Sequence, residues 1–109
     1  MALSSIHQLM SQKERPTAVF AVSDVLAAAA IRGCRLAGLS VPEDIIVTGF
    51  DNVSISQAAS PSITTINQPK YQLGYMACEL LIEKLHTPGV KPRQVLLNTE
   101  LIIRESTQK

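Results

Sequence analysis

Residues Ser23 to Asn52 read SDVLAAAAIRGCRLAGLSVPEDIIVTGFDN and predict one connected structural unit. An apolar helical stretch separates two short apolar strands, Thr17–Val22 and Ile45–Thr48. This order of strand, helix and strand is typical of a right-handed crossover, in which the two strands are parallel. The carboxyl ends of parallel strands meet at one edge of a sheet, where open α/β folds bind small molecules. We therefore expect Asp24 and Asp51, which follow the two strands, to lie at a ligand site.

The rest of the chain fits an α/β fold with a parallel sheet and flanking helices. The strand Thr17–Val22 is apolar throughout, which is typical of a central strand that is covered on both faces. A third strand is expected at Ile63–Ile66, and apolar residues at helical spacing predict an amphipathic helix over Tyr71–Leu85. Further elements are expected as a short N-terminal helix at Ser4–Lys13, a helical turn at Ser54–Ser60, and two strand segments at Gln94–Asn98 and Glu100–Arg104.

The helix that follows Ser23 is apolar on nearly all sides. Ser23 or Asp24 can cap its start, and Gly38 supplies a left-handed stop. One of its faces consists mainly of small residues, namely Leu26, Ala29, Ala30 and Gly33. Because the sheet covers only one face of a helix, we expect this second face to form a dimer interface with another copy of the chain. The alternative is an ordinary core helix of a larger domain.

Composition favours a soluble globular protein of at most one domain. The chain has 109 residues, of which 46% are hydrophobic and 17% charged, and its formal net charge is +1. This charge creates no strong field that would attract nucleic acid or an anionic membrane. No apolar run approaches the roughly 18 residues of a membrane span, and the N-terminus lacks the pattern of a signal peptide. We therefore expect a cytoplasmic protein without membrane contact.

Few side chains are suited to catalysis or metal binding. Cys34 and Cys78 lie in separate helical stretches without a second nearby cysteine, so both are expected to be buried. His7 and His86 lie in or at the end of predicted helices, where a solvated role is expected. The spacing of His, Cys, Asp and Glu matches no metal site, and no glycine-rich phosphate loop is present. We expect no cofactor and no metal, and a function in recognition.

Asp51 is the favoured ligand contact. A carboxylate at the end of a strand can accept two hydrogen bonds from vicinal hydroxyls, which makes a sugar a suitable ligand. The alternative for Asp51 is a turn role beside Asn52. For Ser23 and Asp24, helix capping is the leading interpretation and ligand contact the alternative.

Four segments closely resemble the C-terminal part of LacI/GalR-family bacterial transcription repressors. They are RPTAVFAVSDVLAAAAIRGCRLAGLSVPEDIIVTGFDN, SPSITTINQP, LGYMACELLIEKL and VLLNTELIIREST, and the match covers Pro16 to Thr107. The most specific elements are GLSVPEDIIVTGFDN, the segment around ITTI and QP, and the terminal ELIIREST.

The resemblance implies a partial periplasmic-binding-protein-like (Rossmann-like) α/β fold, in which residues 1–109 form a C-terminal fragment of a two-lobed effector-binding domain. Residues from about 16 to 66 would belong to the C-terminal lobe and those from about 70 to 97 to the N-terminal lobe, with 98–109 crossing back. The family's DNA-binding headpiece is not part of these residues.

The resemblance also implies a function, which is effector binding and dimerisation for transcription regulation. The effector would be a sugar or sugar derivative, the assembly a homodimer, and operator DNA would be bound only through a headpiece. Asp51 matches a carboxylate that contacts effector, whereas Ser23 stands where the family usually has asparagine. We expect the fragment itself to dimerise and not to bind operator DNA.

Two other functions remain open at this point. One is a fragment of a sugar-transport binding protein of the same architecture. The other is a small α/β enzyme that would use Asp24, Asp51 and Cys34, but the chain offers no suitable base for it.

Overall fold

The computed structural model describes residues 2–109, with side chains from Ser4 onward. Its elements are α1 (Ala2–Met10), β1 (Ala18–Phe20), α2 (Asp24–Leu36), β2 (Ile46–Thr48), α3 (Ser54–Ala58), β3 (Thr65–Asn67), α4 (Lys70–His86), β4 (Glu100–Ile102) and the 3-10 helix η1 (Glu105–Thr107). The chain divides into two compact units. Unit 1 comprises the residues up to Asn67 together with Glu100–Lys109, and unit 2 is Gln68–Thr99.

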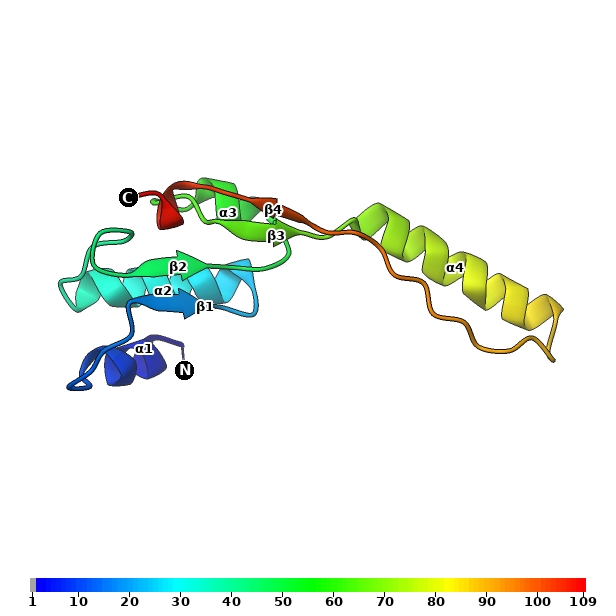
Figure 1. The fold of residues 1–109 in the computed structure, drawn as a ribbon, viewed down its shortest axis with the longest axis horizontal. Helices are drawn as coiled ribbons and strands as arrows, with labels where there is room; N and C mark the ends of the chain where they lie inside the picture. The colour runs from blue at the N-terminus through cyan, green and yellow to red at the C-terminus, as the bar shows by residue number, and fades with distance from the viewer. Residues whose placement is uncertain (1) are drawn as a thin grey trace. The chain divides into compact units, whose positions relative to one another are not determined.

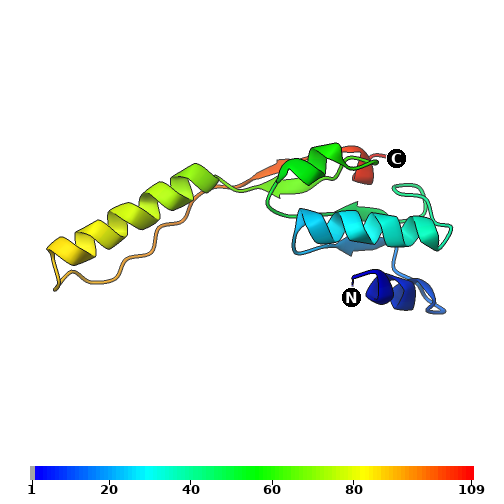
Figure 2. The ribbon, with the colours of Figure 1, turned by 180° about the vertical axis from the view of Figure 1, so that it is seen from behind.

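The crossover expected between Ser23 and Asn52 is present in unit 1. Strands β1 and β2 are parallel, with Val19 opposite Val47 (Figure 1). Helix α2 connects them and lies across one face of the pair, as Figure 2 shows from behind. The helix ends at Leu36, and Gly38 follows in the left-handed conformation with φ 76°. The predicted parallel arrangement is therefore confirmed.

Strand β3 extends this parallel arrangement beyond β2. Two single bridges link the two chain segments in parallel, Thr48 with Thr64 and Asp51 with Asn67. Strand β4 then pairs with β3 in the antiparallel direction, with Ile66 opposite Leu101. The C-terminal segment is thereby held beside β3, although it lies far away in the sequence.

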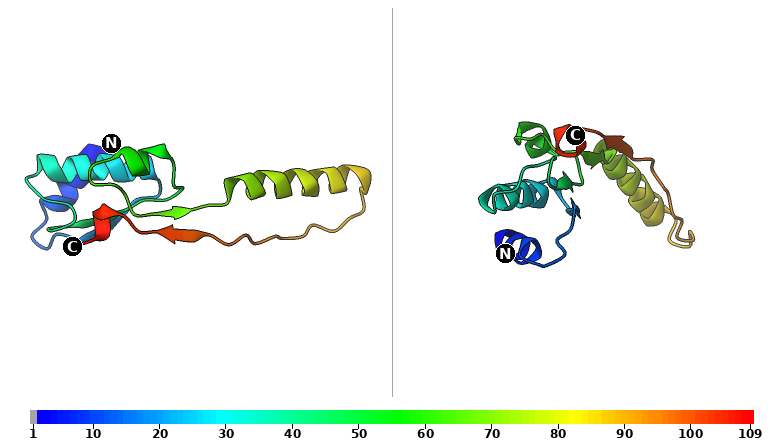
Figure 3. Two further views of the ribbon diagram at one scale, coloured as in Figure 1. Left: turned by 90° about the horizontal axis from the view of Figure 1, so that it is seen from above. Right: turned by 60° about the vertical axis from the view of Figure 1, so that its left-hand side comes forward.

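The core of unit 1 lies between the strands and α2, and both α1 and α3 pack against α2 (Figure 3). Its buried apolar residues are Ile6, Ala21, Ala27, Ala30, Ile31, Cys34, Ile45, Val47 and Ile63. Most of these are aliphatic, as the low aromatic content of the chain predicts. The 3-10 helix η1 packs against β2 at the edge of this core. The buried Ser106 hydroxyl of η1 donates to the Val47 carbonyl at 2.6 Å.

The expectation that β1 is a central strand covered on both faces is wrong for this chain. In the part of the chain that the structure describes, β1 pairs only with β2, and Ala18 and Phe20 are exposed. Val19 is half-buried against the core, whereas its neighbours Ala18 and Phe20 on the other face of β1 are exposed. An apolar strand sequence predicts that both faces of the strand need to be buried, but it does not show whether other segments are present to bury them.

Unit 2 contains the amphipathic helix that the spacing predicts, now observed as α4. None of the residues of α4 is buried, and Leu81 is 59% exposed. The strand segment expected at Gln94–Asn98 is not formed, because residues 87–99 of unit 2 contain no regular element. Local contacts hold the unit instead: Glu83 forms an ion pair with Arg93 at 2.9 Å, and the Lys84 ammonium donates to the Val90 carbonyl at 3.2 Å.

The two cysteines have different environments. Cys34 is fully buried in the core of unit 1, as expected, whereas Cys78 on α4 is exposed, so the prediction that both are buried is wrong for Cys78. Among the apolar residues near Cys78, Ala77 and Leu81 are exposed, and Met76 and Leu80 are only half-buried. Among the described residues, no helix is both long and apolar enough to span a membrane.

Candidate ligand-binding site

The loops that follow β1 and β2 lie side by side at the carboxyl edge of the strands. The backbone N–H of Ala21 donates to the Thr48 carbonyl at 2.8 Å, and that of Asp24 donates to the Phe50 carbonyl at 3.0 Å. Phe50 directly precedes Asp51. The structure therefore brings the Ser23 and Asp24 end of one loop next to the Asp51 end of the other.

Ser23 is the N-cap of α2. Its backbone is extended, and its hydroxyl oxygen accepts a hydrogen bond from the Leu26 N–H at 3.4 Å. The capping interpretation is confirmed for Ser23. Because the oxygen accepts in this bond, the hydroxyl proton stays available to donate to another group.

Asp24 is the first residue of α2, and it holds the loop after β2. Its side chain is fully buried. One carboxylate oxygen accepts from the Val53 N–H at 2.7 Å and the other from the Thr65 hydroxyl at 2.5 Å. Gly49 packs so closely over this carboxylate that a Cβ at position 49 would collide with it. These contacts give Asp24 a structural role, and its full burial leaves no surface of this carboxylate for a ligand to contact.

Asp51 lies half-buried at the end of the loop after β2, in a left-handed backbone conformation with φ 98°. Asn52 follows with φ 51°, so two consecutive residues other than glycine are left-handed. Aspartate and asparagine tolerate this conformation better than most residues. The backbone N–H of Asp51 donates to the Ile66 carbonyl at 3.1 Å, which fixes the loop to β3.

An aromatic pair lies beside the loop that carries Asp51. The rings of Phe20 and Phe50 meet edge to face, with centroids 6.4 Å apart. Phe20 is 65% exposed, so much of its side chain lies open to solvent. This pair was not predicted from the sequence. The pair could have been predicted, because the two phenylalanines stand at or just beyond the ends of neighbouring strands.

A network of polar side chains around Asn52, the residue after Asp51, was also not predicted from the sequence. The Asn52 side chain donates to the Asn67 side chain at 3.1 Å and accepts from the Arg104 guanidinium at 2.8 Å. Arg104 also donates to the Ser56 hydroxyl and to the Ile63 carbonyl. Arg104 lies 52 residues from Asn52 in the chain, and the sequence carries no local signal that would connect them.

The four residues expected at a dimer interface differ in exposure. Ala30 and Gly33 are buried within the chain. Ala29 is half-buried and Leu26 is exposed. The role of these residues in dimerisation stays a prediction, and only Leu26 and Ala29 offer surface for it.

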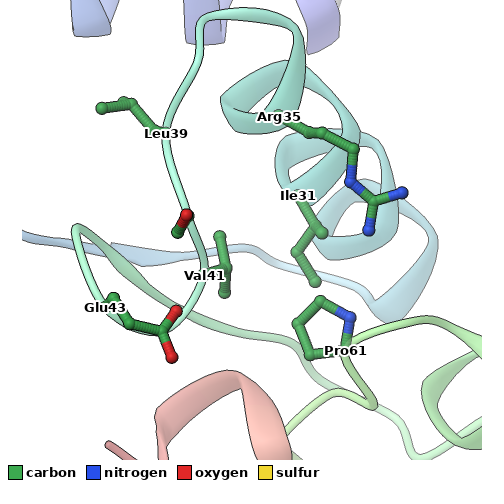
Figure 4. Close-up of a pocket in the computed structure, with 7 residues that line it drawn as sticks. Ile31, Arg35, Leu39, Val41, Glu43 and Pro61 are labelled. Carbon is green, nitrogen blue, oxygen red and sulfur yellow. The ribbon is translucent and has the colours of Figure 1, made fainter.

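A separate pocket of about 220 Å³ lies at the opposite end of α2 (Figure 4). Ile31 and Arg35 form one wall, the loop from Leu39 to Glu43 another, and Pro61 a third. The Arg35 guanidinium donates to the Ser60 carbonyl at 2.8 Å. Because Ser23 lies at the start of α2 and this pocket at its end, the pocket is not part of the candidate site. Among residues 2–109, no group of three or more His, Cys, Asp or Glu side chains is arranged to hold a metal ion.

Comparison with known proteins agrees with this architecture. Residues 1–107 match the model of the periplasmic binding protein-like domain. The chain is 40% identical to the HTH-type transcriptional repressor PurR of Photobacterium profundum over 98% of its own length and 32% of that protein. It thus spans about a third of the length of this curated relative.

Solved structures of regulators have the same fold. A LacI family transcriptional regulator from Enterococcus faecium with bound ribose is 32% identical, has a TM-score of 0.83, and is matched over 97% of this chain and 39% of that one. The lac repressor dimer bound to operator and the anti-inducer ONPF is 31% identical with a TM-score of 0.87, over 97% and 37% of the two chains. This chain therefore belongs to the family of periplasmic binding protein-like domains, and the proteins that it resembles over its length are transcriptional repressors and LacI-type regulators.

Proposed function

We propose that this chain is part of the effector-binding domain of a bacterial transcriptional repressor and that it binds a sugar or sugar derivative. The observation that carries the proposal is the position of Asp51, a half-buried carboxylate at the carboxyl edge of parallel strands. Open α/β sheets bind ligands at this edge. The similarity to repressors supports regulation over catalysis and over transport, and a cytoplasmic location is part of the proposal.

The chemistry of the edge suits a ring that carries hydroxyl groups. The Asp51 carboxylate would accept hydrogen bonds from two neighbouring hydroxyls, and the Ser23 hydroxyl would donate to a third oxygen. The exposed ring of Phe20 would cover an apolar face of the ligand. Ser23 is shorter than the asparagine that the family usually has, so its contact would reach less far into the site. Asp24 is left out of the proposed contacts because its two oxygens hold protein donors.

We further propose that the two compact units belong to different lobes of a larger effector domain. Unit 1 would belong to the C-terminal lobe and unit 2 to the N-terminal lobe, with the chain passing between them after Asn67 and again after Thr99. Effector binding between lobes would shift their closure and thereby change the affinity of a headpiece for operator DNA. This chain would bind no operator by itself.

A homodimer through α2 is the proposed assembly. Helix α2 carries a stripe of exposed or half-buried apolar side chains at helical spacing, formed by Val25, Leu26, Ala29 and Leu36. A second copy would cover this stripe, because a C2 interface joins the same patch on both subunits. The lac repressor structure, which is a dimer, supports this assembly.

The test of the ligand site uses D-ribose as the probe, because the regulator from Enterococcus faecium was solved with ribose. Isotope-labelled protein is titrated with D-ribose at millimolar concentrations, and the amide shifts of Ser23, Asp51 and Asn52 are followed by NMR. We expect saturable shifts at these residues that are lost in Asp51→Ala, whereas Asp44→Ala serves as a matched control in the loop before β2. Saturable shifts confined to other residues, or none at all, would refute the proposed ribose site.

The test of the dimer is sedimentation equilibrium of the wild-type chain and of Leu36→Glu. Leu36 is 73% exposed, so the substitution leaves the core intact while it places a charge in the proposed interface. We expect a dimer that Leu36→Glu converts to a monomer, and Leu85→Glu on α4 is the control that should not change the mass. A wild-type monomer, or a dimer unchanged by Leu36→Glu, would count against the α2 interface.

A further inference from the structure

The left-handed pair Asp51 and Asn52 needs support from the surrounding structure. Both have positive φ, at 98° and 51°, and neither is glycine. A backbone in this region persists only where neighbouring groups hold it. The conformation of the pair sets where the Asp51 carboxylate lies, so whatever supports the pair also sets the geometry of the candidate site.

The Asn52 side chain provides that support through three bonds. Its amide nitrogen donates to the Asn67 Oδ1 at 3.1 Å, which ties it to the last residue of β3. Its amide oxygen accepts from the Arg104 Nη2 at 2.8 Å and from the Ser56 hydroxyl at 3.2 Å. The backbone N–H of Asn52 donates to the Thr65 hydroxyl at 3.3 Å. The donor and the acceptor atom of the amide are both used, so an apolar or purely charged side chain at position 52 could not reproduce these bonds.

Arg104 holds the oxygen side of this amide. Its Nη1 donates to the Ile63 carbonyl at 2.9 Å and to the Ser56 hydroxyl at 3.0 Å, while Nη2 reaches Asn52. The guanidinium is a rigid planar fork, so two of these bonds fix the direction of the third. The backbone N–H of Arg104 donates to the Thr64 hydroxyl at 2.8 Å, which anchors the residue itself.

We propose that Asn52 and Arg104 are positioning residues for Asp51: Arg104 fixes the Asn52 amide, and this amide maintains the left-handed turn that presents the Asp51 carboxylate. The inference rests on the proposed function, in which Asp51 contacts the effector. It assigns no ligand contact to either residue. Both residues act on Asp51 only through the backbone of the loop after β2, and their hydrogen-bond partners belong to β3, to α3 and to the segment after β4.

The experiment measures the turn by NMR in the 109-residue protein without added ligand. Couplings that report φ are recorded at Asp51 and Asn52, together with amide hydrogen exchange at Asp51, whose N–H is bonded to Ile66. In Arg104→Met we expect the left-handed couplings to be lost and the exchange at Asp51 to accelerate at least about tenfold. Arg93→Met, which removes an ion pair with Glu83 in unit 2, should leave the turn unchanged.

A glycine rescue separates positioning from a merely structural role. Glycine adopts positive φ without support, so Asn52→Gly added to Arg104→Met should restore the left-handed couplings at position 52 and at Asp51. A turn that persists in Arg104→Met, or one that glycine does not restore, would overturn the proposal. If Arg104→Met does not fold, the variants Asn52→Ala and Asn52→Gly test the proposal instead. We expect only Asn52→Gly to keep the left-handed turn. Equal couplings in the two variants would overturn the proposal.

The two proposals fail separately in these experiments. The dependence of the turn on Arg104 is measured without ribose, whereas the ribose titration of the wild-type protein tests the ligand site. A turn that depends on Arg104 in a protein that does not respond to ribose would overturn the proposed ribose site and leave the positioning role intact.

Discussion

Units 1 and 2 carry similar apolar patterns but bury them very differently. In unit 1, residues such as Val47 and Ile63 are fully buried. In unit 2, the leucines of α4 recur at helical spacing, yet none of its residues is buried. Amphipathic spacing therefore predicts a helix and the direction of its apolar face, but not whether another segment covers that face.

The difference has a structural cause. In unit 1, segments distant in the chain converge: α1 and α3 pack on α2, and η1 packs on β2. In unit 2, α4 is followed by residues 87–99, which form no helix or strand. A single helix with an extended segment has too little surface to enclose a core, and most helical stability in proteins comes from tertiary packing.

The largest expected contrast between the units is in thiol reactivity. Cys34 is fully buried and burial raises the pKa of its thiol, whereas Cys78 is exposed on α4. Labelling of Cys34 requires opening of unit 1, so it should be slower than labelling of Cys78 by at least about a hundredfold. Rates are measured with a maleimide in the single-cysteine variants Cys34→Ser and Cys78→Ser and checked in Cys34→Ala. Similar rates at the two positions would mean that unit 1 has no closed core in solution.

Truncating one apolar side chain in each unit should give the next largest contrast. Ile63→Ala removes a fully buried side chain from unit 1 and should lower the free energy of unfolding by about 2–5 kcal/mol. Leu81→Ala in the exposed face of α4 should change it by less than about 0.5 kcal/mol. Urea denaturation measures both effects, followed by the fluorescence of a label on unit 1 for Ile63→Ala and by the circular dichroism of α4 for Leu81→Ala. A loss of similar size for Leu81→Ala would show that α4 is covered in solution.

Two glycines offer a matched pair with effects of opposite sign. At Gly49 a Cβ would collide with the Asp24 carboxylate and approach the Asp24 Cα to 3.1 Å, so Gly49→Ala should destabilise unit 1 by about 1–3 kcal/mol. At Gly74, inside α4, a Cβ would meet no atom within 4 Å, so Gly74→Ala should stabilise that helix by about 0.5–1 kcal/mol. The first effect is read from urea denaturation and the second from hydrogen exchange of residues 70–86. Destabilisation by Gly74→Ala would contradict an open environment in unit 2.

The smallest expected effects are on the pH dependence of stability, at acid pH in unit 1 and at alkaline pH in unit 2. In unit 1, hydrogen bonds from the Ser62 backbone N–H and hydroxyl lower the pKa of Glu105. Its contribution to stability is therefore complete above the ordinary glutamate pKa of about 4.3 and is lost as the pH falls through the lowered value. In unit 2, a hydrogen bond to Glu79 raises the pKa of Tyr75. That contribution is complete below the ordinary tyrosine pKa of about 10 and is lost as the pH rises through the raised value.

The two substitutions Glu105→Gln and Tyr75→Phe isolate these effects. We expect Glu105→Gln to flatten only the acid side of the stability profile of unit 1, and Tyr75→Phe to flatten only the alkaline side of the helicity of α4. Both side chains are exposed, so the changes should be small. Urea midpoints and circular dichroism across pH measure them. An acid side that is unchanged in Glu105→Gln would remove Ser62 and Glu105 as a stabilising contact.

Much of unit 1 could be predicted from local sequence. The parallel pair β1 and β2, the helix between them, its cap at Ser23 and its stop at Gly38 all follow from patterns within about one element. The status of β1 as an edge strand could not be predicted, because an apolar strand reads the same whether or not a neighbour is present. The same holds for Cys78, whose helical sequence context resembles that of the buried Cys34.

The candidate site divides in the same way. Asp51 was predicted as a ligand contact from its place after a strand, and that role stays a prediction. The burial of Asp24 between Val53 and Thr65 could not be predicted, since its partners lie 29 and 41 residues away. The sequence by itself determined the helices, the parallel crossover of β1, α2 and β2, and the edge at which Asp51 lies, because helical periodicity, caps and apolar runs act over a few residues. Only the tertiary structure decided which carboxylate is buried, which apolar faces are covered and how Arg104 meets Asn52, because burial and hydrogen bonding depend on groups that the chain brings together from a distance.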